Sequence, residues 1–407
     1  MSKKTILLNE QIEQIKKFVG LNEKVSTQEI SDALSEIVHK NATDFVEIVF
    51  KEADYKKYST EFISCLKKLN VNYSTLIVAK SCENFYLSKT LSSISKKVCI
   101  VVGDGEFIKA TNIFCSQKNV LCYAFLTTPY FTELLNNEYN YIERGRLKTK
   151  KVKELELLVI NENLIKKCNV YEVLKSYSYN LLQAVTLIDY KFSSMLLGKI
   201  VDDNFYKLLK QGLSYTLNFS SYDSTSIVLT LSSFIVNVVD KKSDIIKNST
   251  AQNYLKVMRL TNEDASFALT CFKGFEKLIK LYHFYFNNDF NGVLLYPDYV
   301  NDIEKLSLIT LKEQNELYKN LKVPSAKRLE LRNKLTLKVG AIFLKETSVL
   351  LKVLPNIEKA FYLQLKKERA FKDIDSLDIK NALRLSTYLT ESQNVLVVMR
   401  DLGLLNW

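Results

Sequence analysis

The chain has 407 residues, more than a single hydrophobic core usually supports, and this length predicts two or three domains. It is 47% hydrophobic and 11% aromatic with only 10 glycines and 4 prolines, a composition that excludes disorder and is typical of a helix-rich globular protein. The net charge of +12 would attract phosphate-bearing partners, but the lysines are spread along the chain, so nucleic-acid binding rests on charge alone and is not favoured.

The sequence has no apolar run of about 18 residues, the length that a membrane-spanning helix needs. Its start, Met1-Ser2-Lys3-Lys4, leads into an amphipathic polar segment, unlike the apolar core of a signal peptide. The seven cysteines are scattered, mostly in apolar runs, and none form a Cys-x-x-Cys pair. These features predict a cytoplasmic protein with reduced, buried cysteines, no membrane span and no zinc-cysteine site.

Residues 1–42 are expected to form a helical N-terminal extension, whose second helix begins at the capping-box pattern Ser26-Thr27-Gln28-Glu29. In residues 43–162, short apolar strands alternate with helices. The strands are continuously apolar, which predicts a parallel sheet covered by helices on both faces. The expected strands are 45–50, 75–79, 98–102, 120–125 and 157–160, with helices that include 83–94 and 106–114 and a polar connection around Tyr139 and Tyr141.

Residues 163–407 keep apolar residues at helical spacing and are expected to form an all-helical domain. The run from 227 to 239 could be taken for a strand, but its length and setting favour a buried helix. The predicted fold class is an α/β N-terminal half with a parallel, Rossmann-like sheet, followed by an all-α C-terminal half. Breaks between helices are expected near 202–204, 220–224 and 296–298 and at Pro324 and Pro355.

Gly103-Asp104-Gly105 follows a buried strand and opens a helix, where α/β folds place a phosphate on free backbone amides. The same turn could be only a tight connection, but finding two of ten glycines at this point favours phosphate binding. The next strand ends in Thr127-Thr128, which places two hydroxyls at the same carboxyl edge, although a locally bonded loop is the alternative. Gly103, Asp104, Gly105, Thr127 and Thr128 are therefore the candidate cofactor-binding residues.

The order of these motifs resembles the glycerol-1-phosphate dehydrogenase branch of the iron-containing alcohol dehydrogenase and dehydroquinate synthase superfamily. The resemblance covers roughly residues 45–195 and 375–405. It rests on Gly103-Asp104-Gly105, on Thr127-Thr128-Pro129, on Arg146-Leu147-Lys148-Thr149, and on Ile160-Asn161-Glu162-Asn163-Leu164. The resemblance implies a dehydroquinate synthase-like fold, NAD or NADP as cofactor, and a small phosphorylated substrate that Lys109, Arg146 or Lys148 would bind.

The turn departs from the family pattern, in which a Gly-Gly-Gly turn that binds pyrophosphate is followed by an Asp and a Lys on the helix. Here Asp104 stands inside the turn, Lys109 takes the Asp position and Asn112 takes the Lys position. Asp104 would repel a pyrophosphate unless its side chain turns outward or Lys109 compensates its charge.

The metal site departs further, because the family pattern uses one Asp and two His on the helical half to bind a divalent ion. The chain has only two histidines, and His39 lies in the N-terminal extension, which leaves His283. Asn180 or Tyr179 stands where the ligand Asp is expected, and Asn291-Gly292 where a His-Gly is expected. An amide binds a hard cation more weakly than a carboxylate does, so no metal is expected.

Three other polar positions are given structural interpretations. His283, between aromatic neighbours, is expected to be a packing histidine. The acidic pairs Asp202-Asp203 and Glu263-Asp264 are expected to be helix caps rather than paired catalytic carboxylates.

Two functions stay open. The first is a divergent NAD(P)-dependent dehydrogenase-like protein in which metal-dependent hydride transfer is weakened or lost. The second is a non-catalytic scaffold or regulatory protein that keeps the fold and uses its surface for a partner protein or a second copy. The sequence specifies neither the substrate nor the choice between the two nicotinamide cofactors.

Overall fold

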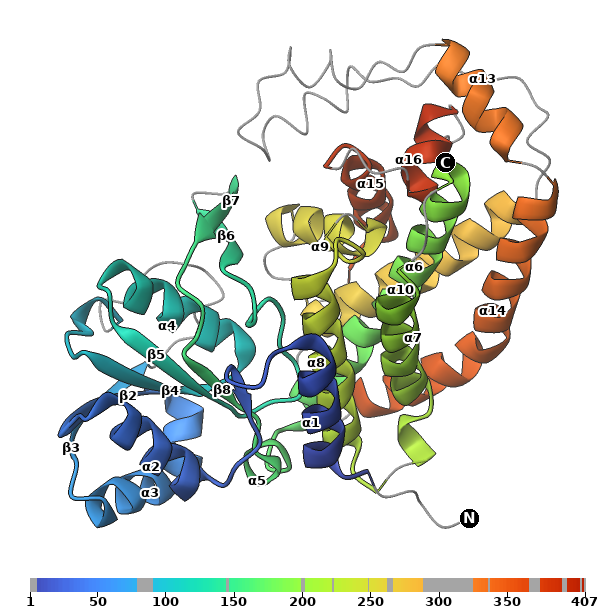
Figure 1. Ribbon diagram of the computed structural model, residues 1–407. Coiled ribbons are helices and arrows are strands. Elements are labelled where there is room, and N and C mark those ends of the chain that lie inside the picture. Colours follow the sequence, from blue (N-terminus) through green and yellow to red (C-terminus); the bar gives the residue numbers. More distant parts are fainter. Residues whose placement is uncertain are drawn as a thin grey trace. The chain divides into compact units, whose positions relative to one another are not determined.

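The computed structural model divides into two compact units (Figure 1). The first unit comprises Met1–Glu143, Lys148–Ser176 and Ser214–Lys242, and the second comprises Arg144–Leu147, Tyr177–Leu213 and Ser243–Trp407. The residues described are 6–78, 91–143, 146–198, 202–221, 223–247, 249–261, 266–287, 325–335, 337–365, 374–389, 394–402 and 405.

The first unit is built on a six-stranded parallel sheet with the strand order β1-β8-β5-β4-β2-β3. The central strand β4 is buried along its whole length, which explains why the sequence of these strands is continuously apolar. The predicted parallel sheet is thereby confirmed. The strands are β1 (Val25–Ser26), β2 (Phe45–Lys51), β3 (Asn72–Val78), β4 (Val98–Gly103), β5 (Leu121–Leu126) and β8 (Leu157–Val159).

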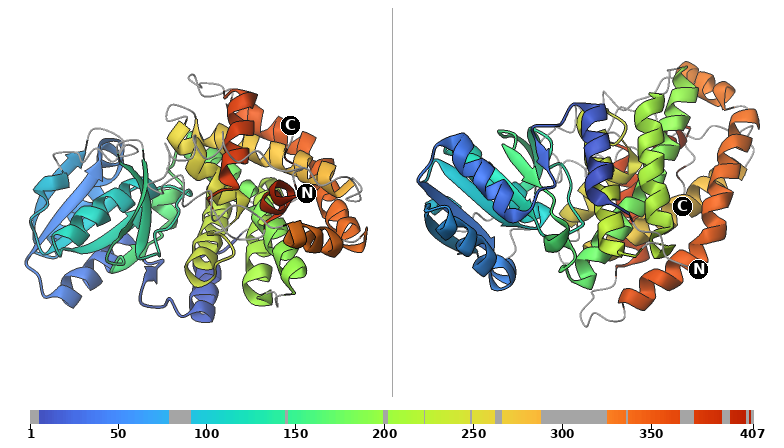
Figure 2. Two further views of the ribbon diagram at one scale, coloured as in Figure 1. Left: turned by 90° about the horizontal axis from the view of Figure 1, so that it is seen from above. Right: turned by 60° about the horizontal axis from the view of Figure 1, so that its bottom comes forward.

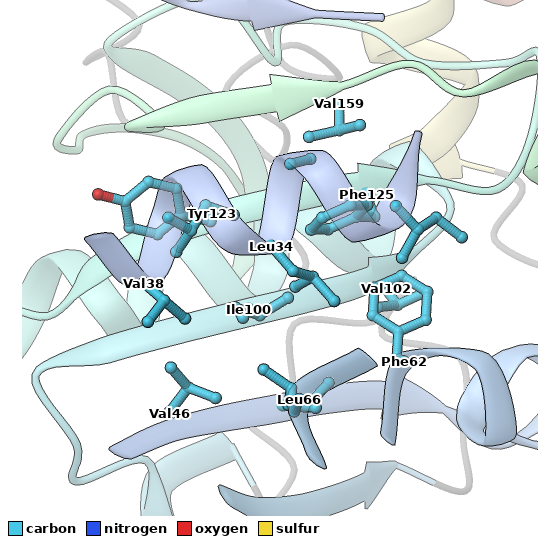
Figure 3. Close-up of a cluster of buried hydrophobic side chains, with 14 of the residues drawn as sticks. Leu34, Val38, Val46, Phe62, Leu66, Ile100, Val102, Tyr123, Phe125 and Val159 are labelled. Carbon is cyan, nitrogen blue, oxygen red and sulfur yellow. The ribbon is translucent and has the colours of Figure 1, made fainter. Parts of the chain in front are cut away.

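Helices cover both faces of this sheet (Figure 1). On one face, α2 (Ile30–Asn41) and α3 (Glu52–Lys68) bury a cluster of apolar side chains against the strands (Figure 3). The rings of Phe62 and Phe125 meet edge to face within it, with 4.9 Å between their centroids. On the other face, α4 (Gly105–Gln117) packs on β4 and β5.

Two features of the first unit differ from the sequence-based expectation. The polar connection after Thr128 contains a two-stranded sheet of β6 (Glu138–Glu143) and β7 (Arg146–Lys151). The lysines of β7 conceal its strand pattern in the sequence. The expected capping box is wrong, because Ser26 lies in β1 and α2 begins after Glu29. Pairing of Val25 and Ser26 with β8 takes that segment into the sheet.

Every described element after β8 is a helix, as predicted. The strand-like run at 227–239 lies inside α8, which is buried almost throughout and belongs to the first unit with α1 (Leu8–Val19). The helices after β8 are α5 (Glu162–Ile165), α6 (Val170–Leu197), α7 (Asp203–Leu217), α8 (Thr225–Lys242), α9 (Thr250–Thr261), α10 (Phe267–Asn287), α13 (Ser325–Lys334), α14 (Leu337–Leu365), α15 (Ser376–Ser386) and α16 (Val395–Asp401).

One expected helix break is wrong: Pro355 lies inside α14, which runs from Leu337 to Leu365. None of the helices in the described part of the chain combines the length and hydropathy needed to cross a membrane. Several expectations concern positions outside the described residues. These are the helix at 83–90, Glu263-Asp264, Asn291-Gly292, the break at 296–298 and Pro324.

Candidate functional site

The Gly103-Asp104-Gly105 turn lies between the end of β4 and the start of α4, as the sequence predicts. Asp104 is the N-cap residue of α4, and its Oδ1 accepts a hydrogen bond from the backbone N–H of Phe107 at 2.9 Å. Its other oxygen, Oδ2, lies 2.6 Å from Nζ of Lys51, the last residue of β2. The Asp104 side chain therefore turns toward the helix amides, and Lys51 rather than Lys109 balances its charge.

Burial of Lys51 lowers its pKa, but the charge of Asp104 and its hydrogen bond outweigh that effect, so the pKa is raised overall. The ammonium group therefore stays charged at neutral pH, and the Lys51–Asp104 pair persists.

Both glycines of the turn are needed for packing. A Cβ atom on Gly105 would lie 2.7 Å from Cβ and 2.8 Å from Cα of Phe131, so the backbone after β5 passes directly against the start of α4. A Cβ atom on Gly103 would lie 2.5 Å from Cδ1 of Phe107, whose ring is buried. The close approach of the Phe131 backbone accounts for Gly105, and the buried Phe107 ring accounts for Gly103.

Asp54, in the first turn of α3, joins the same edge of the sheet. Burial and then the negative charge of Asp104 raise the pKa of Asp54 to about 7, while Lys51, the Thr127 hydroxyl and Lys57 oppose the shift. The hydroxyl of Thr127 is buried and has no hydrogen-bond partner of ordinary geometry among the described residues. It lies near enough to Asp54 to lower the pKa of that carboxyl group. A carboxyl group that titrates near neutrality is therefore present beside the predicted threonine.

The first turns of α6 bring two more charges to this edge. Oε1 of Glu172 lies 3.3 Å from Nζ of Lys175, and both side chains are buried. Burial raises the pKa of Glu172, and Asp104 raises it further, although Lys175 and Lys51 act in the opposite direction. We call the resulting group the carboxyl-edge cluster; it consists of Lys51, Asp54, Asp104, Thr127, Glu172 and Lys175.

Thr128 is not part of this cluster. Its hydroxyl donates a hydrogen bond to the carbonyl of Tyr130 at 3.1 Å, which matches the locally bonded loop. Of the five candidate cofactor residues, the structure brings Gly103, Asp104, Gly105 and Thr127 to the edge; the backbone N–H of Thr127 donates to the Gly103 carbonyl at 3.0 Å.

The candidate substrate-binding residues lie elsewhere in the first unit or in β7. Lys109 is buried, and its ammonium lies 3.2 Å from carboxylate oxygens of both Glu106 and Glu133. Asn112 also faces the interior, where its Nδ2 donates to the Tyr139 hydroxyl at 3.0 Å. Arg146 and Lys148 lie in the strand β7. Lys109 is thus held by two carboxylates, which explains why it does not balance Asp104.

In the second unit, the residues at the expected metal position lie inside α6. Asn180 is buried, and the hydroxyl of Tyr179 accepts a hydrogen bond from Nε2 of Gln252 at 2.7 Å. Nδ1 of His283 lies 3.1 Å from the Thr347 hydroxyl, which joins α10 to α14. Within the part of the chain that the structure describes, no three His, Cys, Asp or Glu side chains are placed to hold a metal ion.

Asp189, further along α6 than Asn180, is a buried carboxylate of the second unit. Its oxygens accept hydrogen bonds from the Tyr282 hydroxyl at 2.7 Å, from Thr250 N at 2.8 Å and from Val395 N at 3.2 Å. Burial raises the pKa of Asp189 to about 6 against these hydrogen bonds, which lower it. A single side chain thereby ties α6 to α9, α10 and α16.

The comparisons with known proteins concern the fold. No family model and no curated protein sequence matches the chain. An iron-containing alcohol dehydrogenase from Thermotoga maritima is similar in structure, with a TM-score of 0.52 and 10% identity over 93% of this chain and 96% of the other. The glycerol dehydrogenase of Schizosaccharomyces pombe gives 0.51 and 10% over 86% and 93%. The NADH-dependent butanol dehydrogenase A of Thermotoga maritima gives 0.50 and 10% over 89% and 96%.

These similarities show that the chain has the fold of the iron-containing alcohol dehydrogenases and dehydroquinate synthases, as predicted. At 10% identity, these similarities are evidence for the fold only.

We expect Asp54→Asn to change how stability depends on pH. The folded pKa of Asp54, about 7, lies above the ordinary pKa of an Asp side chain, 3.8, so folding favours the protonated form. Stability is therefore lost as the pH rises from about 4 to about 7. The variant should melt at a higher temperature than the parent at pH ~8 and at a similar one at pH ~4. Thermal melts across this range test this, with Glu52→Gln in the same turn as control; parallel profiles for parent and Asp54→Asn would contradict it.

We expect Gly105→Ala to lower the free energy of unfolding by about 1–3 kcal/mol, because the new methyl group overlaps the backbone at Phe131. Gly340→Ala in α14 is the matched control, since its Cβ would lie 3.6 Å from the Phe286 carbonyl oxygen, an ordinary contact. That change should be neutral or stabilise by up to about 1 kcal/mol. Urea unfolding measures the free energy of unfolding of both variants. Equal effects of the two substitutions would show that the close approach at Gly105 does not affect stability.

Proposed function

We propose that this chain is a divergent dehydrogenase-like protein resembling the glycerol-1-phosphate dehydrogenase branch, which has lost metal-dependent hydride transfer and works in the cytoplasm as a non-catalytic scaffold or regulatory protein. The observation that carries the proposal is the Lys51–Asp104 pair at the start of α4, with 2.6 Å between Nζ and Oδ2. It occupies the turn that, by the resemblance, would bind the pyrophosphate of NAD or NADP.

The residues of this turn do not fit a pyrophosphate. A phosphate at a helix start needs free backbone amides and positive charge. Here the Asp104 carboxylate accepts the Phe107 N–H, and the Phe131 backbone lies against Gly105. Lys51 and Lys175 are already paired with Asp104 and Glu172, so a pyrophosphate would have to compete with these carboxylates for positive charge.

The donor set of the second unit does not fit a divalent ion either. The resemblance calls for one Asp and two His, and the chain has two histidines in all, of which His39 lies in the first unit. His283 contacts Thr347 and Asn180 offers an amide, whereas the oxygens of Asp189 already accept three hydrogen bonds. These observations support the loss of metal-dependent chemistry.

A second candidate, retained binding of NAD or NADP, is supported by the carboxyl-edge cluster. Oε2 of Glu172 is buried and has no hydrogen-bond partner among the described residues. Asp54, with a pKa of about 7, is also the kind of shifted group that gathers at binding sites. Such acceptors suit the hydroxyl groups of a ligand rather than its phosphates, and Lys109, being ion-paired, would not bind a phosphorylated substrate.

The proposal predicts that neither NADH nor NADPH raises the melting temperature of the parent protein, and that no hydride transfer to or from glycerol 1-phosphate is detected with added zinc or iron. Asp104→Asn retains a capping side chain and frees Lys51, so it should bind a dinucleotide more tightly than the parent. Asp32→Asn, on the exposed side of α2, is the control. Tight dinucleotide binding by the parent would favour the second candidate, and turnover would overturn the proposal.

We expect Asp189→Asn to lower the free energy of unfolding by about 1–3 kcal/mol, because the new amide group leaves one of the three donors without an acceptor. Asp203→Asn, at the exposed start of α7, should have little effect. If Asp189 instead held a metal ion, a chelator would destabilise the parent and not the variant. Melting with and without chelator separates these two roles.

A further inference from the structure

The long helix α14 lies along the outside of the helices of the second unit (Figure 2). Its inner face is fully engaged within that unit. The rings of Phe361 and Phe272 stack with 4.2 Å between centroids, and Phe343 packs against Phe286 at 5.1 Å. The inner side chains Phe343, Thr347, Leu350, Leu354, Ile357 and Phe361 are all buried. These contacts account for one side of the helix only.

The opposite face of α14 carries apolar side chains in contact with solvent. Val349 is 56% exposed, Leu363 is 55% exposed and Val353 is 36% exposed. Lys345, Lys352, Asn356 and Lys359 are exposed beside them. We call the line of six residues Lys345, Val349, Lys352, Asn356, Lys359 and Leu363 the outer stripe of α14.

The outer stripe has the spacing of a helix-pairing seam. Its members are alternately four and three residues apart, so the pattern repeats every seven residues and keeps one line of side chains along the helix. Val349, Asn356 and Leu363 take one set of seam positions, and the three lysines take the other. Of the three exposed aliphatic residues of α14, Val349 and Leu363 lie in this line and Val353 lies beside it.

We propose that the outer stripe of α14 is the docking site for an acidic amphipathic helix of a partner protein. The proposal rests on the scaffold or regulatory function proposed above and identifies the surface that such a function would use. The argument is charge complementarity: three lysines point from the seam, and the stripe contains no carboxylate. A partner helix with leucine-like residues opposite Val349 and Leu363, and glutamates opposite the lysines, meets both requirements.

A second copy of the chain fits the stripe poorly, because Lys345, Lys352 and Lys359 would face lysines across the seam. An anionic membrane surface fits less well than a helix. Membrane-surface helices have a wide apolar face with the lysines at its border. Here the lysines lie in the same line as Val349, Asn356 and Leu363, so they are not confined to the border of an apolar face.

The test uses two synthetic helical peptides of about three heptads, both with leucine at one seam position and with either glutamate or lysine at the other. Fluorescence anisotropy measures their binding to the full chain. The glutamate peptide should bind, less tightly at high salt, and the lysine peptide should not. The double variant Lys352→Glu with Lys359→Glu should weaken binding of the glutamate peptide by roughly tenfold or more and bind the lysine peptide instead.

Lys207→Glu with Lys210→Glu on α7 is the matched control, because it changes the net charge equally on another exposed helix. Circular dichroism and melting temperature check the fold of both variants. Equal binding of both peptides, binding that survives reversal of Lys352 and Lys359, or binding to anionic vesicles but not to the glutamate peptide would overturn the proposal. The activity assay tests the proposed scaffold function separately, because hydride transfer in that assay would contradict it.

Discussion

The first turn of a helix leaves backbone N–H groups without acceptors in the helix, and at the carboxyl edge of a parallel sheet these groups attract an anion. In this chain Asp104 is that anion. A largely buried carboxylate needs a counter-charge, which Lys51 provides from the end of the neighbouring strand β2. Burial raises the pKa of both Asp54 and Glu172, and the charge of Asp104 raises both further. The carboxyl-edge cluster thus follows from one helix start.

The sequence was sufficient for the sheet because its strands are buried on both faces. Val98 to Val102 is apolar at every position, and in an α/β pattern such a run is typical of a strand in a parallel sheet that is covered on both faces. It was also sufficient for α8, which is too long for a strand. It was insufficient for β1, a two-residue strand whose local pattern favours a helix cap, and for the lysine-rich β7. Pairing partners more than 100 residues away decide β1.

The position of the candidate site was predictable, but its chemistry was not. Gly103, Gly105 and Thr127 follow strands, and the carboxyl ends of parallel strands share one edge. The same rule applied to β2 would have added Lys51 and Asp54. Whether Asp104 turns outward or caps its own helix depends on Lys51, which is 53 residues away in the sequence. Glu172 and Lys175 lie in α6, and the strand pattern does not predict that this helix reaches the edge of the sheet.

Asp104 and Asp189 each accept hydrogen bonds from buried backbone groups within their own unit. Asp104 stabilises the start of α4 from inside the first unit, and Asp189 joins four helices of the second unit. A polar group that is bonded within its own unit needs no ligand to offset the cost of its burial. Neither Asp104 nor Asp189 therefore needs a ligand to offset its own burial. Under the scaffold function proposed above, recognition of a partner would depend on exposed residues, such as the aliphatic and lysine side chains on the outer face of α14.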